Sequence, residues 1–592
     1  MSGQWGPLYR TCSIIIMQTS PISPFYLTIG VTGHRDIPPE DVAVLKPVIK
    51  SRLLELQVTF KDTPLLVLSG LAEGADRLVV EVAHEMGIAF AAILPLPAED
   101  YATDFDEPSS KQKFYNWLDK AAWIETLSQQ KPEGTISYPR NSCYEQLGFY
   151  LAQNSHVLFA LWDGDKQEKT GGTSQVVRYF LQGVSDKSVD RTSALNLPSY
   201  RPVEHVLIRR TSQPDAIGIE QVGAVETRWP HVNFDDEAWL EKRWKLSLLS
   251  LGNFNENMLA FSHANPDSVL TSRKYLLGDD TVYDSLDSKA QRIADLFAVS
   301  DAMSSYAQSQ RHKNFLALVV FALSAVISQQ SYGFFLQWYL LVGSLCLGGI
   351  SYWLYRTSQR QRLEEKYLDY RALAEGLRVQ FFWHAARVNL PAADYFLRDQ
   401  RDELEWIRHA MTASQLSSPI ETHKKSHLWI IERWVRDQRI YFIGDQTKGR
   451  LGKARIDARA EKKLTRRMKQ CFFTGLGLML FSAIAYEWIY ADLTIEWKSL
   501  LLNGLLATSG AILCMVPSIK IYLDTMAFDE HAKRYLRMGQ YYGLCEKQLE
   551  NLNEAHAAEI DQLFIDIGQQ ALIETGDWLL LHRQRPVKVP VI

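Results

Sequence analysis

The first part of the chain alternates short apolar runs with amphipathic stretches. The apolar runs are Tyr26–Val31, Leu65–Leu68, Ala89–Leu94, Val157–Trp162 and Val203–Ile208. A buried parallel strand reads as a short apolar run that ends in turn residues, and runs that alternate with helical patterns indicate βαβ units. From about Tyr26 to Tyr179 the sequence therefore predicts an α/β domain with a parallel sheet.

Less regular sequence follows this domain. A helix is expected after Asp76, because Leu78, Val79, Val82 and Ala83 recur on one face. The Asp/Ser-rich sequence between Val184 and Ser199 predicts an exposed loop. From there to about Asp280 the sequence carries few signals of secondary structure. A helical section is expected from about Asp287.

The hydropathy then changes, with two pairs of long apolar segments. The first pair is Asn314–Ile327 and Phe334–Tyr355, with the polar link Ser328–Gly333 between them, and the second is Cys471–Tyr490 and Ser499–Met515. A bilayer requires about 20 apolar residues per helix. We expect four transmembrane helices in two hairpins. A buried core helix is the alternative for each single segment.

Basic residues flank both hairpins, whereas the links inside them carry acids or no charge, apart from Lys498. The positive-inside rule then places the α/β domain and both termini in the cytoplasm of a multi-pass protein of the inner, cytoplasmic membrane. Aromatic residues near the segment ends, such as Trp338, Tyr352 and Trp353, are typical of an interfacial belt, and a core role is the equal alternative for any one of these rings. The flanking cations are Arg311, His312, Lys313, Arg356, Arg360 and Arg362 at the first hairpin, and Lys462, Lys463, Arg466, Arg467 and Lys469 before the second.

Each hairpin leads into a long helical pattern, which indicates a coarse internal duplication. Both patterns carry one apolar stripe that is expected to pack either within the chain or against another subunit. The stripes consist of Leu363, Tyr367, Tyr370, Leu373, Leu377 and Phe381, and of Phe528, Tyr535, Met538, Tyr542 and Cys545.

Four regions result. Residues 22–210 form the expected α/β domain, and 211–290 a poorly defined connection. Residues 291–412 hold the first hairpin at about 314–355. Residues 413–592 hold a second, similar unit with its hairpin at about 471–517 and C-terminal helices.

Composition and charge argue against several classes of partner and cofactor. The formal charge of -4 shows no global basic field, so no nucleic-acid partner is predicted. The six cysteines are scattered without metal-like spacing, which favours a reduced, cytosol-facing protein, and no metal is predicted. The apolar patch Ile14–Met17 is too short for a signal-peptide core, so no cleaved export signal is expected.

Three glycine-bearing turns follow the apolar runs, at Gly30–Arg35 (GVTGHR), Ser69–Asp76 (SGLAEGAD) and Trp162–Gly164, with Gly171–Thr173 beyond. Strand ends of this kind meet at one crevice in an open α/β sheet. Backbone N–H groups and helix N-termini in such a crevice bind a phosphate by donating hydrogen bonds to its oxygens. The cofactor is unknown, and a nucleotide is the expected ligand of the domain at residues 22–210.

Individual roles remain open at several positions. Arg35 offers a charge-assisted contact, and Thr32 and Thr173 offer hydroxyl groups. Asp76 or Glu73 either accepts from a ribose hydroxyl or only stabilises a helix dipole. His34 orients a ligand, caps the turn or faces water. The candidate ligand-binding residues are Gly30, Thr32, Gly33, His34, Arg35, Ser69, Gly70, Glu73, Gly74, Asp76, Trp162, Asp163, Gly171, Gly172 and Thr173. No catalytic residue is assigned.

These motifs resemble the SLOG superfamily, the Rossmann-like group that includes the LOG nucleotide hydrolases, the DNA-processing protein DprA and the amino-terminal region of TRPM channels. The membrane half is similar to SLATT effectors at Tyr370–Trp383 and Ala571–Leu579. The resemblance implies a soluble sensor of a nucleotide-type signal, fused to a membrane effector of prokaryotic antiphage defence.

The resemblance departs at one point that bears on catalysis. LOG hydrolases carry the motif PGGxGTxxE, whose glutamate serves catalysis. Here the stretch Thr170–Val177 (TGGTSQVV) keeps the glycines and lacks a glutamate in the expected place. Binding without hydrolysis is therefore favoured, although Glu73, Asp76 or Glu145 remain possible carboxylates.

Three functions are consistent with these patterns. The leading hypothesis is a cytoplasmic sensor that gates a membrane pore or disrupts the membrane, with abortive infection as the outcome. Because four helices are too few to enclose a conducting path, a homo-oligomer in the lipid bilayer is expected. The alternatives are a membrane-anchored nucleotide N-glycosidase or another nucleotide-processing enzyme, and a scaffold protein with a degenerate nucleotide fold.

Overall fold

The computed structural model describes most of the chain. The described residues are 22–127, 139–165, 169–183, 200–230, 236–388, 390–396, 401–416, 426–445, 447–488, 495–552 and 556–583. Two sequence expectations, the apolar patch at 14–17 and the exposed loop at 184–199, lie outside them.

The chain forms two compact units, and each is discontinuous in sequence. Unit 1 comprises Met1–Ser300, Leu373–Phe381 and Asn389–His423. Unit 2 comprises Asp301–Ala372, Phe382–Val388 and Lys424–Ile592.

Unit 1 contains a doubly wound sheet. Within the described residues its seven strands have the order β4-β3-β2-β1-β5-β6-β7. All neighbours pair in parallel except β6 and β7. This arrangement confirms the α/β Rossmann-like class. The strands are β1 (Leu27–Gly33), β2 (Leu65–Ser69), β3 (Ala89–Leu94), β4 (Ile124–Thr126), β5 (Val157–Trp162), β6 (Val203–Leu207) and β7 (Val225–Arg228).

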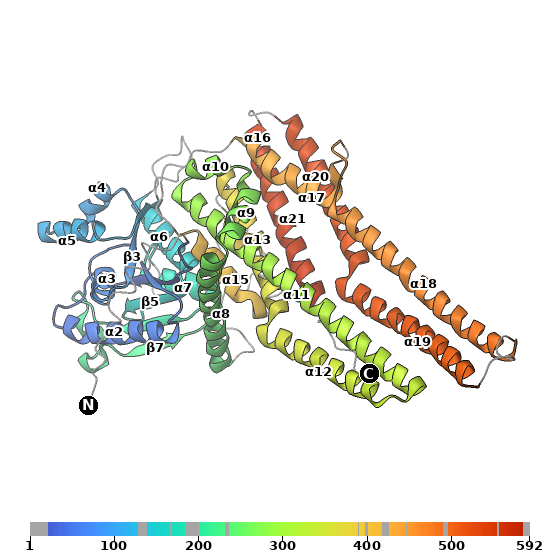
Figure 1. Ribbon diagram of the computed structural model, residues 1–592. Coiled ribbons are helices and arrows are strands. Elements are labelled where there is room, and N and C mark those ends of the chain that lie inside the picture. The colour runs from blue at the N-terminus through green and yellow to red at the C-terminus, as the bar shows by residue number, and fades with distance from the viewer. Residues whose placement is uncertain are drawn as a thin grey trace, which may run out of the picture. The chain divides into compact units, whose positions relative to one another are not determined.

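Helices cover both faces of this sheet (Figure 1). Helix α3 (Ala75–Glu85) buries the predicted face of Leu78, Val79, Val82 and Ala83, and it packs with α2 (Val42–Thr59). Helices α6 (Arg140–Asn154) and α7 (Thr173–Gln182) bury Leu147, Leu151, Val176 and Phe180 in two hydrophobic clusters with strand residues. The shorter helices are α4 (Ala98–Tyr101), η1 (Ala102–Asp104), α5 (Pro108–Leu118), η3 (Pro214–Ala216) and η4 (Ile219–Gln221).

The region that carried few sequence signals is largely helical. It forms α8 (Glu237–Ala264), α9 (Pro266–Leu277) and α10 (Asp280–Asp284). Asp236 caps α8 by accepting from the Ala238 N–H. Helix α8 packs on α15 (Arg401–Ser414), where the rings of Phe254 and Trp406 lie 5.7 Å apart. The short helix α14 (Ala392–Tyr395) precedes α15.

The chain contains four helices that are long and apolar enough to cross a membrane, within the described residues. They fall in α11 (Ser288–Phe335), α12 (Trp338–Gln361), α18 (Lys453–Trp488) and α19 (Ile495–Met526). At most 17% of each apolar window is buried in the structure. A core helix would be covered by protein, so this exposure favours membrane helices over the alternative of core helices.

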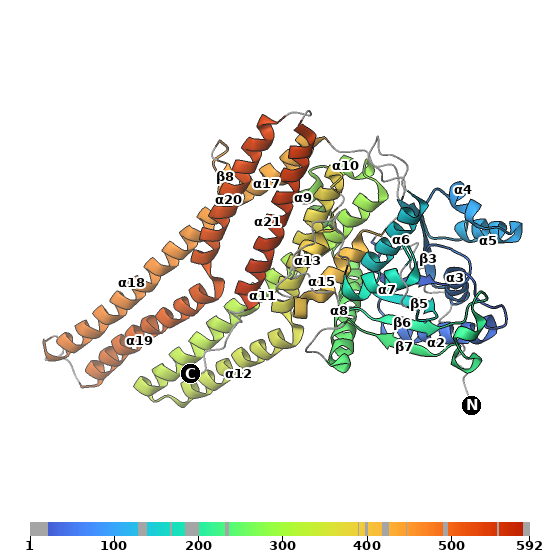
Figure 2. The ribbon, with the colours of Figure 1, turned by 180° about the vertical axis from the view of Figure 1, so that it is seen from behind.

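The four helices form two hairpins, as Figures 1 and 2 show. The turn of the first hairpin differs from the expectation. The polar stretch Ser328–Gly333 is helical, and the chain turns instead at Leu336, which has a φ of 52°. Ser331 donates to the Ile327 carbonyl at 2.8 Å and Ser328 to the Leu340 carbonyl at 2.7 Å. These hydroxyl groups are satisfied without breaking the helix.

Polar contacts join the two hairpins. The Asn503 amide donates to the Phe334 carbonyl at 2.9 Å, and the Cys514 Sγ lies 3.7 Å from the Gln330 Oε1. Gly510 leaves room for the Gln330 amide, since a Cβ at Gly510 would overlap it. Small and polar residues at such crossings are typical of helix packing in membranes.

The apolar stripes after the hairpins lie in α13 (Leu363–Ala386) and α20 (Phe528–Asn551). All six stripe residues of α13 are buried, as are Met538, Tyr542 and Cys545 of α20, whereas Phe528 and Tyr535 are half-buried. These stripes therefore pack largely within the chain. The remaining elements are α16 (His427–Ile430), the π-helical η5 (Ile431–Arg436), α17 (Asp437–Ile443), β8 (Gly444–Asp445), β9 (Arg450–Leu451) and α21 (Ala557–Arg583).

Candidate functional site

The sheet reverses its winding direction between β1 and β5. From β1 the chain adds β2, β3 and β4 on one side, and it then returns to place β5 on the other side of β1. Gly33 is opposite Leu161 at the carboxyl ends of these two strands. Ligands of open α/β sheets bind at such a switch point.

A crevice of about 490 Å³ lies there. This volume falls within the range of small-molecule sites, roughly 300 to 1,000 Å³. Its walls come from the turn after β1, the turn after β5 and the segment that opens α7. Ten of the fifteen candidate residues line it, namely Thr32, Gly33, His34, Arg35, Asp76, Trp162, Asp163, Gly171, Gly172 and Thr173.

The other five candidates lie beside the crevice. The Ser69 Oγ accepts from the Leu71 N–H at 3.1 Å, and Glu73 accepts from the Ser110 hydroxyl. A Cβ at Gly30 would overlap the Ser155 side chain, and one at Gly70 would lie 2.8 Å from Leu147. These four residues serve packing and loop structure here, and whether any of the fifteen binds a ligand stays a prediction.

Gly74, the fifth of these, positions the turn after β1. It has a φ of 73°, and a Cβ there would overlap the carbonyl groups of His34 and Arg35. The next residue, Ala75, donates its N–H to the His34 carbonyl at 3.0 Å. The start of α3 therefore holds the β1 turn in place.

A contact between side chains joins the two strand-end turns. The His34 Nε2 lies 3.0 Å from the Asp163 Oδ1, and the Arg210 Nη1 lies 3.9 Å from the Asp163 Oδ2. Burial raises the pKa of Asp163, but hydrogen bonds from His34 and the Asp165 N–H outweigh it and lower this pKa below its usual value. Asp163 is therefore an ionised acceptor at the crevice.

Asp76 behaves in the opposite way. Burial raises the pKa of its carboxyl group to about 6, although the Ala72 N–H and the charges of Arg35 and Arg77 act against the rise. A strongly shifted group in a cleft is a common feature of functional sites.

The start of α7 lines the crevice. Gly171 has a φ of 76°, and its N–H donates to the Gln175 Oε1 at 2.7 Å. The first N–H groups of a helix have no partner inside the helix, and they carry the positive end of its dipole. Thr173 and Ser174, the first two residues of α7, line the crevice.

Three aromatic side chains on the crevice wall carry donors without a partner among the described residues. They are the hydroxyl groups of Tyr101 and Tyr144 and the Nε1–H of Trp162. Tyr101 and Trp162 are at most 3% exposed. Burial raises the pKa of Tyr101, so its phenol stays protonated and is able to donate. Buried polar groups are almost always paired, so these three donors, which are themselves shielded from solvent, stand out beside the crevice.

Sequence reasoning missed several lining residues. Tyr101 follows β3, and Arg210 follows β6. Both strands were predicted from the sequence. The segments that follow their carboxyl ends were therefore the signal that could have identified these two residues. Lys169 and the exposed Arg35 have no ion-pair partner among the described residues, and the Arg35 guanidinium lies 5.4 Å from the centre of the Tyr144 ring.

The carboxylate Glu145 is engaged elsewhere. It accepts from the Gln175 amide at 2.8 Å and from the Tyr179 hydroxyl at 2.6 Å. Gln175 thus joins Glu145 to the glycine turn through its bond with the Gly171 N–H. This network gives Glu145 a structural role.

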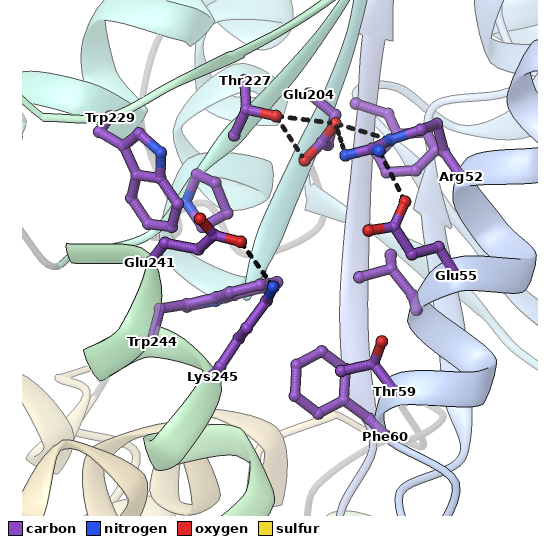
Figure 3. Close-up of a pocket in the computed structure, with 13 residues that line it drawn as sticks. Arg52, Glu55, Thr59, Phe60, Glu204, Thr227, Trp229, Glu241, Trp244 and Lys245 are labelled. Atoms are coloured by element: carbon purple, nitrogen blue, oxygen red, sulfur yellow. Dashed lines mark hydrogen bonds and ion pairs between the residues drawn. The ribbon is translucent and has the colours of Figure 1, made fainter. Parts of the chain in front are cut away.

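A second cavity of about 240 Å³ lies against α2, α8, β6 and β7 (Figure 3). Its charges are paired with one another: Arg52 with Glu204 at 2.7 Å and with Glu55 at 2.6 Å, and Lys245 with Glu241 at 2.5 Å. The Thr227 hydroxyl also donates to Glu204. The crevice at β1 and β5 is larger, and its cations Arg35 and Lys169 have no ion-pair partner among the described residues, so it is the stronger candidate site.

Comparisons with known proteins identify no relative: no family model, curated protein or solved structure matches this chain. The assignment of the fold rests on its own sheet order.

Proposed function

We propose that the crevice of unit 1 binds a nucleotide-type ligand, and that this binding controls the permeability of a membrane crossed by the helices of unit 2. The observation that carries the proposal is the crevice of about 490 Å³ at the switch point, lined by Arg35, Lys169 and the start of α7. Phosphate oxygens accept from such groups, and the ionised Asp163 suits a ribose hydroxyl.

The membrane part of the proposal is supported by the four exposed apolar helices. The basic flanks favour both termini in the cytoplasm. The inner membrane is proposed from the resemblance to prokaryotic effectors. Four helices are too few to enclose a conducting path, which favours a homo-oligomer. A ligand gates such an assembly only if it binds the open and closed states with different affinity.

The wider role is proposed from the resemblance to SLOG sensors and SLATT effectors. A membrane made leaky after infection dissipates ion gradients and stops growth, which is the outcome of abortive infection. This role in prokaryotic antiphage defence rests on that resemblance.

The test is ion leak from vesicles that contain the purified chain. Nucleoside mono-, di- and triphosphates and cyclic nucleotides are added one at a time while potassium efflux is recorded. We expect efflux with at least one of them. The variants Arg35→Ala and Gly172→Val should abolish it, because Gly172 has no room for a side chain beside the Lys169 carbonyl. Lys61→Ala, an exposed cation of the same unit, is the matched control.

No efflux with any nucleotide, despite correct insertion, contradicts the gating proposal. Efflux that persists in Arg35→Ala and Gly172→Val places the trigger outside the crevice.

A second candidate, a membrane-anchored nucleotide N-glycosidase, is favoured by Asp76, whose pKa of about 6 suits proton transfer near neutral pH. It predicts that the chain releases free base from nucleoside monophosphates or NAD, as chromatography would detect. Asp76→Asn should then abolish turnover while ligand binding remains. Binding without turnover in the wild type would exclude this candidate.

A further inference from the structure

Helix α18 carries a row of exposed cations just before its apolar stretch. Lys462, Lys463, Arg466, Arg467 and Lys469 are all exposed. At about 100° per residue these five positions fall on one side of the helix, within an arc of about 160°.

Acids do not neutralise this row. Among the described residues, none of the five cations has an ion-pair partner. The acids nearby are engaged elsewhere: Glu461 accepts from Thr465, and Asp457 lies 3.4 Å from Lys453. On the neighbouring helices, Asp524 and Asp529 pair with Lys520 and Lys533 at 2.7 and 2.5 Å.

The row lies close to the edge of the apolar stretch. The apolar stretch begins at Cys471, and a helix rises 1.5 Å per residue, so the five cations begin about 3 to 14 Å from the apolar edge. The headgroup layer is roughly 5 to 8 Å thick on each side of the bilayer. Long basic side chains bend toward that layer, which brings even the far members within reach.

We propose that this face of α18 binds the headgroups of anionic phospholipids in the leaflet next to it. The inference depends on membrane insertion as proposed above and is independent of the crevice. Phospholipid is favoured over a soluble anion because the cations adjoin the apolar stretch directly. Each Lys or Arg near an anionic surface contributes about 1 kcal/mol, which is about a fivefold preference.

The flanks of the first hairpin are partly neutralised, in contrast. Arg311 pairs with Glu364 at 2.8 Å, and the Arg362 Nη1 lies 3.7 Å from Glu365. The second hairpin therefore carries the stronger attraction for acidic lipid.

The test counts the lipids bound to the full chain. Protein purified in detergent is mixed with equal amounts of phosphatidylglycerol and phosphatidylcholine, and the bound lipids are counted by native mass spectrometry. We expect at least about fivefold more phosphatidylglycerol than phosphatidylcholine. In the quadruple variant K462Q/K463Q/R466Q/R467Q the ratio should fall to near one. Raising NaCl from 50 to 500 mM should lower the wild-type ratio through screening.

The matched control is K520Q/K533Q, which removes two cations that have acidic partners, and its ratio should equal the wild-type ratio. Equal binding of both lipids by the wild type, or an unchanged ratio in the quadruple variant, overturns the proposal. Insertion is followed separately as resistance to carbonate extraction from phosphatidylcholine vesicles. Loss of that resistance in the wild type would contradict membrane placement itself.

Discussion

At the scale of single residues, Asp76 links the crevice to pH. Its carboxyl group has a pKa of about 6 in the folded chain, against 3.8 for the ordinary group. A raised pKa means that the folded state holds the proton more tightly. The stability from this group is therefore fully present below about pH 4 and is lost as the pH rises through 6.

Asp76→Asn should thus stabilise unit 1 at pH 8, where the buried charge is removed, by on the order of 3 kcal/mol. At pH 4 it should have almost no effect, because the wild-type group is already neutral in the folded state. An asparagine keeps an acceptor for the Ala72 N–H. The change in the free energy of unfolding is measured at both pH values by thermal unfolding, with tryptophan fluorescence as the signal.

Asp100→Asn, at a carboxylate on an exposed part of unit 1, is the control. An equal gain for Asp76→Asn at both pH values would show that its carboxyl group does not titrate near 6.

The residues of the crevice were predictable to different degrees. Strand ends and glycine turns are local in sequence, so His34, Asp163 and Gly172 were found from the pattern. Tyr101 and Tyr144 line the crevice from the short helix α4, which follows β3, and from α6. Their unpartnered hydroxyl groups depend on tertiary packing, which no local pattern reports.

At the scale of elements, the contact between α3 and the β1 turn depends on Gly74. Gly74→Ala places a Cβ against the His34 and Arg35 carbonyl groups and displaces the turn that carries both side chains. We expect loss of nucleotide-triggered efflux together with a lower unfolding temperature.

Gly87→Ala is a matched control, since Gly87 has the same φ of 73° and its Cβ would meet nothing within 4 Å. Gly87→Ala should lower the free energy of unfolding by about 1 kcal/mol, because alanine is strained at this φ, and nucleotide-triggered efflux should remain. If both variants lost the response equally, strain rather than displacement of the turn would explain it.

The contact between α11 and α19 permits a crosslink. Gln330→Cys should form a disulfide with Cys514 under copper phenanthroline, because these side chains already touch. If gating separates the hairpins, the oxidised variant should show no efflux until it is reduced.

Adding Cys514→Ser should prevent both the crosslink and its effect. A crosslinked protein with normal efflux would mean that the hairpins stay together during gating.

Element prediction failed for identifiable reasons. Helix α8 buries residues on more than one side, because Trp244 packs on Phe60 and Phe254 packs on Trp406. Its sequence therefore lacks a single apolar stripe. Strand β7 is a short edge strand with the polar sequence VETR, and tertiary pairing with β6 alone makes it a strand.

At the scale of the whole molecule, the orientation in the membrane is a prediction. In intact bacteria, Leu336→Cys in a cysteine-free chain should react with a membrane-impermeant maleimide, because the α11–α12 turn then faces the periplasm. Leu336 is 75% exposed, so access does not limit labelling.

Thr447→Cys, in the turn between β8 and β9, should react only after the cells are permeabilised. The reverse pattern of labelling would place the termini and the crevice outside the cytoplasm.

The discontinuity of unit 1 has a consequence for biosynthesis. Leu416, which follows α15, lies in the same hydrophobic cluster as Leu66 and Ile93 of the sheet, and the His156 ring lies 3.2 Å from the His409 carbonyl. The ribosome makes these residues only after the first hairpin. The hairpin therefore emerges, ready for the insertion machinery, before the crevice domain is able to complete its core. A chain cut after residue 300 would never complete it, and unit 1 is assembled only on a chain that already carries the first apolar hairpin.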